Sequence, residues 1–155
     1  MALTIKSGNL FKEDVDVIVN PWNRNIFPWW ILIPQGVSGQ LKKLAGVSPF
    51  VELGYRPMRV GEARLTKAGK LNFKGIIHVA GINLFWFATE YSIRQSIQNS
   101  IKICEENNFK SIAFPYIGSG TGNFRSEKVE KLFLDYFKTN PISIEVILVK
   151  YQLNE

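Results

Sequence analysis

Apolar residues in the second half of the chain recur with the spacing of helices. Between residues 90 and 107, Ile93, Ile97, Ile101 and Cys104 follow one another at intervals of four, four and three, which places them on one helical face. A second apolar face begins after Ser126 and consists of Val129, Leu132, Phe133 and Tyr136. Each pattern predicts an amphipathic helix that covers a sheet. A third, shorter helix is expected over residues 40–44, with Ser38 or Gly39 near its N-cap and Gly46 at its end.

Short runs rich in β-branched residues alternate with these helices. The run 15–19 (VDVIV) suits a central strand that is covered on both faces. The expected strands are 3–6, 15–19, 61–66, 75–80, 111–114 and 142–149. Strands that alternate with helices predict an α/β fold with three layers, α/β/α. Because no internal repeat or low-complexity segment interrupts the pattern, we expect a single domain over residues 1–155.

A glycine-rich loop follows the strand expected at 111–114. It carries Gly118, Gly120 and Gly122 and leads into the helix expected from Ser126. Backbone N–H groups in such a loop form a concavity for anions, and the positive end of the following helix adds to the attraction. Phosphate is the ligand that this pattern favours. The alternative is a connection that only turns the chain, because short glycine motifs are common.

A second loop, residues 20–34, contains three prolines but also three tryptophans and a phenylalanine, which favour burial. It leads through residues 35–39 into the short helix, whose start can also offer backbone donors. Ligands of open α/β sheets bind beyond the carboxyl ends of central strands. If the parent strands of both loops are neighbours, the loops could close over one crevice and bind the two phosphates of a diphosphate, with the Trp-rich loop as a lid.

Composition narrows the partners and the compartment. A net charge of +6 favours phosphate-bearing or polyanionic partners. One cysteine and one histidine exclude a disulfide framework and a Cys/His zinc site, and we expect no metal and no cofactor. The longest apolar stretch, 26–34, is far shorter than the ~20 residues of a membrane span. We expect a cytoplasmic location, and the strands close to both ends of the sequence are compatible with a domain excised from a longer, membrane-attached protein.

Six stretches in this order resemble motifs of the macro domain family, whose members bind ADP-ribose. They are residues 8–10 (GNL), 17–23 (VIVNPWN), 36–39 (GVSG), 61–63 (GEA, with Thr66 and Gly69), 74–78 (KGIIH) and 112–122 (IAFPYIGSGTG). Together they span nearly the whole chain. The resemblance implies a mixed, twisted sheet between helices, with ADP-ribose in a cleft at its top.

The resemblance also assigns binding residues. It places Gly8 and Asn9 at the adenine, Asn20 and Asn23 near the distal ribose, and Gly36, Val37, Ser38 and Gly39 along the diphosphate. It places Gly118, Ser119, Gly120, Thr121, Gly122, Asn123 and Phe124 in a second phosphate-and-ribose loop, with Phe124 against the distal ribose. Trp29 and Trp30 belong to the lid, where they either pack internally or contact the ligand or a partner.

Three departures from the family pattern bear on chemistry and ligand. Asn9 stands where the family usually has an aspartate, and its amide oxygen can accept the same bond from adenine. Ser38 stands where hydrolytic members commonly carry an aspartate, and a serine cannot act as a carboxylate base. The bulky segment 26–34 replaces a small, glycine-rich one and suggests a specialised ligand. It resembles the sensing macro domains of bacterial Thoeris-type antiphage systems, which are attached to membrane segments.

Other reactive residues have plainer interpretations. His78 lies inside an apolar strand and is expected to be a hydrogen-bonded core residue. Cys104 falls on the buried face of a helix and is expected to act as a small hydrophobe. Glu62 could be a base near the cleft, but a solvated or paired carboxylate is the commoner case.

Three functions remain in competition. The first is binding or sensing of ADP-ribose or a derivative without chemistry. The second is hydrolysis that removes ADP-ribose from a protein, nucleic acid or small molecule, with Asn23 placing a water. The third, nucleic-acid binding, has the charge in its favour but no RNP-like, KH-like or helix-turn-helix pattern. The resemblance leaves hydrolysis open and favours the non-catalytic domain.

Overall fold

The computed structural model describes residues 3–22, 36–54, 56–81, 88–118 and 125–151. The strands in this part of the chain are β1 (Leu3–Gly8), β2 (Val17–Pro21), β3 (Ala63–Thr66), β4 (Gly75–Val79), β5 (Ser111–Pro115) and β6 (Glu145–Tyr151). The helices are α1 (Gly36–Ala45), α2 (Ser48–Leu53), α3 (Glu90–Glu106) and α4 (Ser126–Thr139), with a single 3-10 turn, η1 (Leu10–Lys12).

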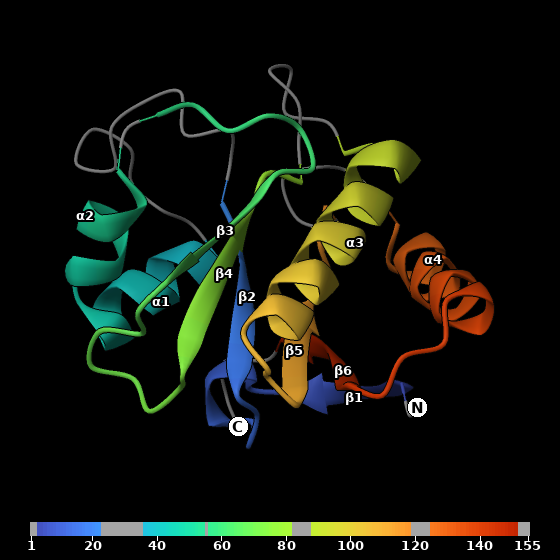
Figure 1. The fold of residues 1–155 in the computed structure, drawn as a ribbon, viewed down its shortest axis with the longest axis horizontal. Coiled ribbons are helices and arrows are strands. Elements are labelled where there is room, and N and C mark those ends of the chain that lie inside the picture. The colour runs from blue at the N-terminus through green and yellow to red at the C-terminus, as the bar shows by residue number, and fades with distance from the viewer. Residues whose placement is uncertain (1–2, 23–35, 55, 82–87, 119–124, 152–155) are drawn as a thin grey trace.

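The described strands form one six-stranded mixed sheet in the order β1-β6-β5-β2-β4-β3. All neighbours are parallel except β3, which runs antiparallel to β4 at one edge. Helices α1 and α2 cover one face of the sheet, and α3 and α4 cover the other (Figure 1). The predicted α/β fold, a single domain of three layers with a mixed sheet, is therefore confirmed.

Strand β2 lies inside the sheet, between β5 and β4, as its β-branched sequence predicted. Its side chains alternate between the two cores. Val17 and Val19 join the cluster under α3 and α4, whereas Ile18 joins the cluster under α1 and α2. All three are at most 1% exposed. A strand that is covered on both faces has no polar side, which explains its nearly continuous apolar sequence.

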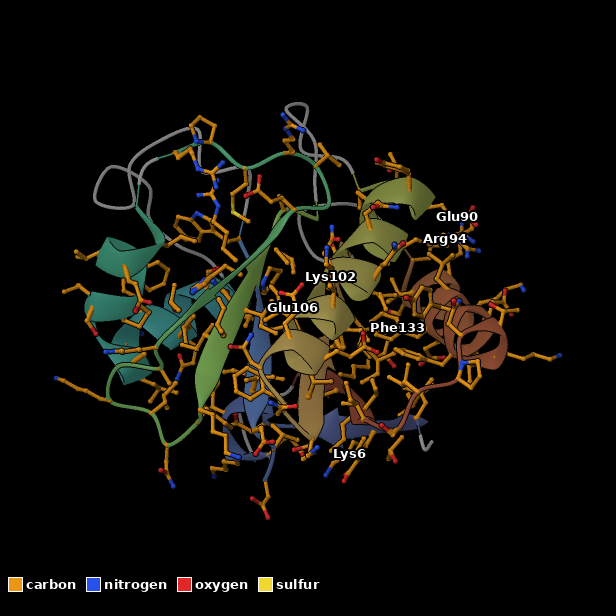
Figure 2. The ribbon with its side chains drawn as sticks, in the orientation of Figure 1. Lys6, Glu90, Arg94, Lys102, Glu106 and Phe133 are labelled. Carbon is orange, nitrogen blue, oxygen red and sulfur yellow. The ribbon has the colours of Figure 1, made fainter. Side chains whose placement is uncertain are left out.

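Helix α3 shows how local signals and packing agree. Its N-cap, Thr89, forms a capping box with Ser92, because each side chain accepts the backbone N–H of the other. The outer face carries the i,i+4 ion pairs Glu90–Arg94 and Lys102–Glu106 (Figure 2). In the neighbouring helix α4, Phe133 is fully buried and contacts Phe114 of β5 at 5.1 Å between ring centroids.

The structure corrects the start of the first helix and adds a helix. Helix α1 begins at Gly36 and not near residue 40, so Ser38 and Gly39 lie in its first turn and not at its N-cap. Gly46 follows its end with φ +84°, as a helix stop signal requires. Helix α2 was not predicted. Its first turn contains Pro49, and a proline is tolerated at this position of a helix. Six residues are too few to show a clear helical periodicity in the sequence.

Several strand boundaries also differ from the prediction. Strand β2 begins two residues later than expected and includes Asn20 and Pro21. Strand β3 begins at Ala63, because the backbone at Gly61 has φ +84° and Glu62 N donates to Arg59 O in a turn. Strand β6 begins at Glu145, where its pairing with β5 starts. Pairing partners set these ends, and the chain pattern alone does not contain them.

Candidate functional site

The two loops singled out in the sequence leave neighbouring parallel strands. Strand β2 pairs with β5 in the register Val17↔Ile112 and Ile18↔Ala113. Strand β4 lies parallel on the other side of β2. The carboxyl ends of all three strands therefore lie at one edge of the sheet, which we call the carboxyl edge. The condition for one shared crevice between the two loops is met.

The beginning of the Trp-rich loop packs into the core. Trp22 is 4% exposed, and its ring lies 5.2 Å from that of Phe50 in α2. The backbone N–H of Trp22 donates to Asn20 O, which turns the chain directly after the strand. The first of the three tryptophans thus anchors the loop and is not a lid residue. Asn23, Trp29 and Trp30 lie outside the described residues, and their predicted roles stay predictions.

The first turn of α1 lies next to the end of β2. Gly36, Val37, Ser38 and Gly39 occupy this turn, whose first backbone N–H groups have no partner within the helix. Val37 packs against the core under α1 and α2. Ser38 Oγ donates to Asn20 Oδ1 at 2.7 Å, and its longer contact with Pro21 O is 3.5 Å. The turn is thus held by the packing of Val37 and by the hydrogen bond of Ser38, and it contains no acidic side chain.

Asn20 faces the protein interior. The residue is 1% exposed, and its Nδ2 lies 3.0 Å from His78 Nδ1. Both ends of its amide therefore have protein partners, which makes Asn20 a support beneath the predicted ribose position. His78 is fully buried, as the prediction of a core histidine requires, and burial lowers its pKa to about 3. Its Nε2 lies 2.9 Å from Thr66 Oγ1.

The predicted adenine position lies at the end of β1. Gly8 is the last residue of β1 and is buried. Asn9 caps η1, and its Oδ1 accepts the N–H of Phe11 at 2.9 Å. An amide oxygen has two lone pairs, so one acceptor position of Asn9 remains for a ligand. The structure therefore gives Asn9 a capping role that the sequence analysis did not assign.

The glycine loop is anchored at its root by a tyrosine. Tyr116 follows β5, and its hydroxyl donates to the carboxylate of Glu130 in α4. Burial and this bond raise the pKa of Tyr116. Gly118 has φ +82°, a backbone conformation that favours glycine. Residues 119–124, which include every other predicted contact of this loop, lie outside the described residues.

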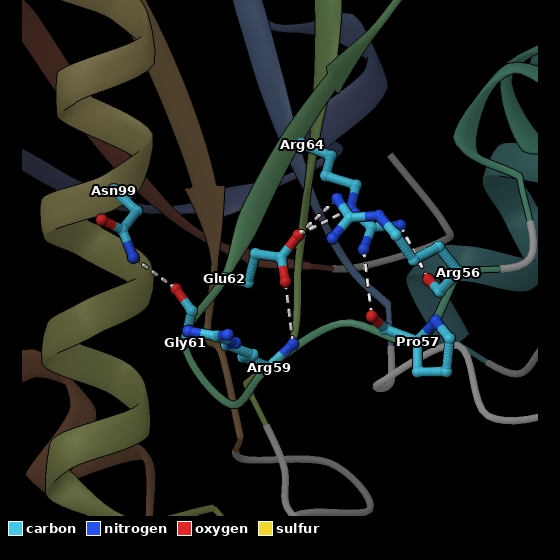
Figure 3. A network of polar contacts seen from close by, with 7 residues as sticks. All are labelled: Arg56, Pro57, Arg59, Gly61, Glu62, Arg64 and Asn99. Atoms are coloured by element: carbon cyan, nitrogen blue, oxygen red, sulfur yellow. Dashed lines mark hydrogen bonds and ion pairs between the residues drawn. The ribbon is translucent and has the colours of Figure 1, made fainter.

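An arginine cluster lies at the carboxyl edge beside β3 and β4 (Figure 3). The Glu62 carboxylate accepts from the side chains of Arg64 (Nε, 2.7 Å) and Arg56 (3.3 Å), and from the backbone N–H of Arg59 at 2.9 Å. Burial raises the pKa of Glu62, but these hydrogen bonds and cations outweigh it and hold the pKa below its usual value. Glu62 is thus paired, as its plainer interpretation predicted. The guanidinium groups of Arg56 and Arg64 beside this single carboxylate leave a net positive charge at this part of the edge.

The remaining candidates are structural. Cys104 is fully buried, and burial raises the pKa of its thiol to about 12, so the reactive thiolate is disfavoured. In the described ranges, His, Cys, Asp and Glu residues form no group that could hold a metal ion. None of the helices in those ranges is both long enough and apolar enough to span a membrane.

Comparison with known proteins identifies the family. Residues 19–133 match the Macro domain family, and the chain belongs to it. It is 30% identical over 152 residues to an uncharacterized protein of Aquifex aeolicus, covering 96% of this chain and 89% of the relative. It is 29% identical over 127 residues to an O-acetyl-ADP-ribose deacetylase of Salmonella newport, covering 76% of this chain and 67% of the relative.

Solved structures agree on the fold. A variant of the Oceanobacillus iheyensis macrodomain with ADPR superposes with a TM-score of 0.81 over 96% of this chain and 84% of that chain, at 22% identity. At this identity the likeness establishes the shared fold.

Proposed function

We propose that this domain binds ADP-ribose or an ADP-ribose-derived nucleotide at the carboxyl edge, and that it reads this ligand without chemistry. One observation carries the proposal: β2 and β5 are parallel neighbours, and their carboxyl ends lead to the helix start at 36–39 and to the loop that begins at Gly118. Two sets of backbone donors on adjacent strand ends suit the two phosphates of a diphosphate.

Charge and hydrogen-bonding capacity support the same ligand. Each phosphate of ADP-ribose is anionic, and the first turn of α1 presents the positive end of a helix without an acidic side chain. The guanidinium groups of Arg56 and Arg64 add positive charge to the same edge. At the end of β1, the remaining lone pair of Asn9 Oδ1 can accept a hydrogen bond from adenine. The macrodomain with ADPR named above shows that this fold accommodates such a ligand.

The identity of residue 38 favours a reader over a hydrolase. Ser38 is 6% exposed, and its hydroxyl proton is directed at Asn20 Oδ1. It therefore supplies no carboxylate, and its hydroxyl proton is already donated to the protein. Glu62, a carboxylate at this edge, already accepts bonds from the side chains of Arg56 and Arg64 and from the backbone N–H of Arg59. General-base assistance is typically worth about 10²–10⁴-fold in rate, so its loss separates the two functions.

The test is a titration of the whole chain with ADP-ribose, followed by thermal unfolding and by calorimetry. At one hundred times the dissociation constant, binding should stabilise the fold by about 2.7 kcal/mol. AMP and ribose 5-phosphate are the matched controls, since each offers only part of the ligand. Absence of a shift with any ADP-ribosyl compound at millimolar concentration would refute the proposal.

A variant of the glycine loop separates binding from folding. Gly120→Val should abolish binding while the fold survives, because a branched side chain blocks close approach of the backbone to phosphate. Gly120→Ala provides the graded control and should weaken binding less. If a folded Gly120→Val protein kept its affinity, the 118–124 loop would be only a turn.

Hydrolysis is the second candidate, and the identity to the Salmonella deacetylase favours it. In this case Asn23 would place a water, with the diphosphate of the ligand assisting. The measurement follows release of ADP-ribose from a mono-ADP-ribosylated carrier under single-turnover conditions, by the wild type, Ser38→Asp and Asn23→Ala. Rapid release by the wild type that Ser38→Asp does not change and Asn23→Ala removes would establish the hydrolase.

A signalling role in antiphage defence, in the cytoplasm, is the narrower form of the proposal. It rests on the bulky segment 26–34, which lies outside the described residues, and on no relative named above. A panel of ADP-ribose derivatives extended at the distal ribose addresses it directly. Tighter binding of one extended derivative than of ADP-ribose itself would support a specialised signal, and equal binding of all would contradict it.

A further inference from the structure

Four buried polar side chains form a chain of hydrogen bonds that runs from α1 over the neighbouring strands β2 and β4 to the edge strand β3. Ser38 Oγ bonds to Asn20 Oδ1 at 2.7 Å, and Asn20 Nδ2 bonds to His78 Nδ1 at 3.0 Å. His78 Nε2 lies 2.9 Å from Thr66 Oγ1, which donates to Lys67 O at 3.0 Å. The four side-chain residues are at most 6% exposed. They come from four elements, so the chain links parts of the sequence that are far apart.

The carbonyl oxygen of Lys67, at one end of this hydrogen-bond chain, determines the donor and the acceptor in every bond of the chain. Lys67 O is a carbonyl and can only accept, so the single hydroxyl proton of Thr66 goes to it. His78 Nε2 must then carry a proton and donate it to Thr66 Oγ1. Its Nδ1 is left without a proton and accepts from Asn20 Nδ2, which turns Asn20 Oδ1 towards the Ser38 hydroxyl. The imidazole is neutral in this arrangement.

The opposite direction satisfies fewer contacts. Thr66 would donate to His78, and Lys67 O would lose its proton donor. Asn20 would then present its NH₂ group to Ser38, which would have to donate to Pro21 O over the longer 3.5 Å contact. The opposite direction therefore leaves the 3.0 Å contact between Thr66 Oγ1 and Lys67 O without a proton, and it replaces the 2.7 Å bond of Ser38 by a longer one. The first direction therefore defines one orientation of the Asn20 amide.

We propose that His78 and Thr66 are positioning residues of the ADP-ribose site: through Asn20 they hold Ser38, and with it the phosphate-binding first turn of α1. This inference rests on the proposed function. The other residues of that turn are Gly36, Val37 and Gly39, which have no polar side chains, so within the described residues Ser38 is its polar side-chain anchor to the sheet. Backbone donors bind phosphate well only when they are held in place before the ligand arrives.

The first test measures the protonation of His78 in the unaltered protein. The chain contains one histidine, so a long-range ¹H–¹⁵N spectrum of the labelled protein reports this residue alone. The expected result is a protonated Nε2 and an unprotonated Nδ1 at neutral pH. A protonated Nδ1 would overturn the direction of the chain and the inference with it. No variant has to fold for this measurement.

The second test asks whether a change at Thr66, at one end of the hydrogen-bond chain, alters the first turn of α1 at the other end. Thr66→Val removes the acceptor of the His78 proton at nearly constant shape, and Thr66→Ser keeps the hydroxyl. Ser100→Ala is the matched control, since Ser100 Oγ is a buried hydroxyl without a hydrogen-bond partner in the described residues. Thr66→Val should shift the backbone amide resonances of residues 37–39, while Thr66→Ser and Ser100→Ala leave them in place. Unchanged resonances in Thr66→Val would overturn the inference, whatever the ligand proves to be.

Ligand affinity completes the experiment. Thr66→Val should weaken ADP-ribose binding about tenfold, the effect of one lost hydrogen bond, and both controls should bind like the wild type. Wild-type affinity in a folded Thr66→Val protein would overturn the positioning role. If the wild type itself binds no ADP-ribosyl compound, the proposed function fails, and the amide resonances still decide whether the chain positions the turn.

Discussion

The two faces of the sheet contain different kinds of core. Under α3 and α4 the core is apolar, and two of its buried serines bond to nearby carbonyls, Ser92 to Gly81 O and Ser96 to Ser92 O. Under α1 and α2 a polar chain of His78, Asn20 and their partners runs through an otherwise apolar cluster.

Buried polar groups cost free energy unless they are hydrogen-bonded, so a core gains nothing from them by burial alone. The apolar face can be built from hydrophobic periodicity, and its helices are the ones the sequence predicted best. The polar chain occurs on the face where α1 begins, next to the end of β2. From this difference we infer that one face mainly stabilises the domain, whereas the other also sets the geometry of the candidate site.

A matched pair of phenylalanines tests this division with the largest expected effect. Phe50 on the α1/α2 side and Phe133 on the α3/α4 side are both fully buried. Phe50→Ala and Phe133→Ala should each lower the free energy of unfolding by about 3–5 kcal/mol in chemical denaturation. Phe50 contacts the rings of Trp22 and His78, so only its loss should also weaken ligand binding by the folded fraction. Equal loss of affinity in both variants would contradict the division.

The pH dependence of stability isolates the polar face. His78 has its pKa lowered to about 3 by burial, whereas in the unfolded chain it has its ordinary value of about 6.5. Below about pH 6.5 the unfolded chain therefore binds a proton that the folded chain does not. The free energy of unfolding decreases by about 1.4 kcal/mol for each unit by which the pH is lowered in this range. Between pH 7 and pH 5 the loss should be about 2 kcal/mol in urea titrations.

A histidine-free variant is the control for that slope. Asp16 and Glu62 also have lowered pKa values, but their contribution is lost only below about pH 5. His78→Gln keeps hydrogen-bonding capacity and has no charge to gain, so its stability should be nearly constant between pH 7 and pH 5. The same slope in His78→Gln as in the wild type would show that another group is responsible.

Gly69, which packs against the last residue of α1, tests how closely the end of this helix contacts the following loop. Gly69 has φ +59°, and a Cβ there would collide with the carbonyl oxygen of Ala45, the acceptor of Lys70 N–H. Gly69→Ala should lower the free energy of unfolding by about 1–3 kcal/mol. Gly54→Ala is the control, because Gly54 also has a positive φ, +78°, but open space around it. Equal effects would mean that backbone strain alone is measured.

The smallest effect is expected from a serine of α3. Ser100→Ala removes a buried hydroxyl that has no partner in the described residues, and alanine is the better helix former. Thermal unfolding should show unchanged stability or a gain of up to about 1 kcal/mol. Ser96→Ala, which loses a 2.7 Å bond to Ser92 O, is the comparison and should not gain. A clear loss in Ser100→Ala would reveal a partner for this hydroxyl.

Sequence patterns predicted the fold well where one element carries its own signal. Helix α3 was expected at 90–107 and occupies Glu90–Glu106, since its apolar spacing and its Thr89 cap are both local. Helix α2 escaped prediction because six residues hold less than two helical turns. The start of α1 was placed too late, because Gly36 and Gly39 are poor helix formers and gave no helical signal in the sequence.

The candidate site was predictable in its parts but not in its connections. Glycines at 36, 39 and 118 marked both segments that are predicted to bind phosphate, and their placement at strand ends followed from the α/β pattern. The structural roles of Asn20 and Asn9 could not be predicted from the sequence. Asn20 bonds to His78 in a neighbouring strand, and Asn9 caps the turn that follows it. The available signals were a histidine inside the apolar strand β4 and a threonine at the end of β3.

By itself the sequence determined the family, the alternation of strands and helices, and the substitution of serine for aspartate at position 38, because each is carried by neighbouring residues or by residue identity. Only the tertiary structure decided that β2 lies between β5 and β4, that Trp22 belongs to the core, and that Ser38 is joined to Thr66 through two other side chains. Hydrogen bonds act over about 3 Å, so residues far apart in the chain can share one only after the order of the strands has brought them together.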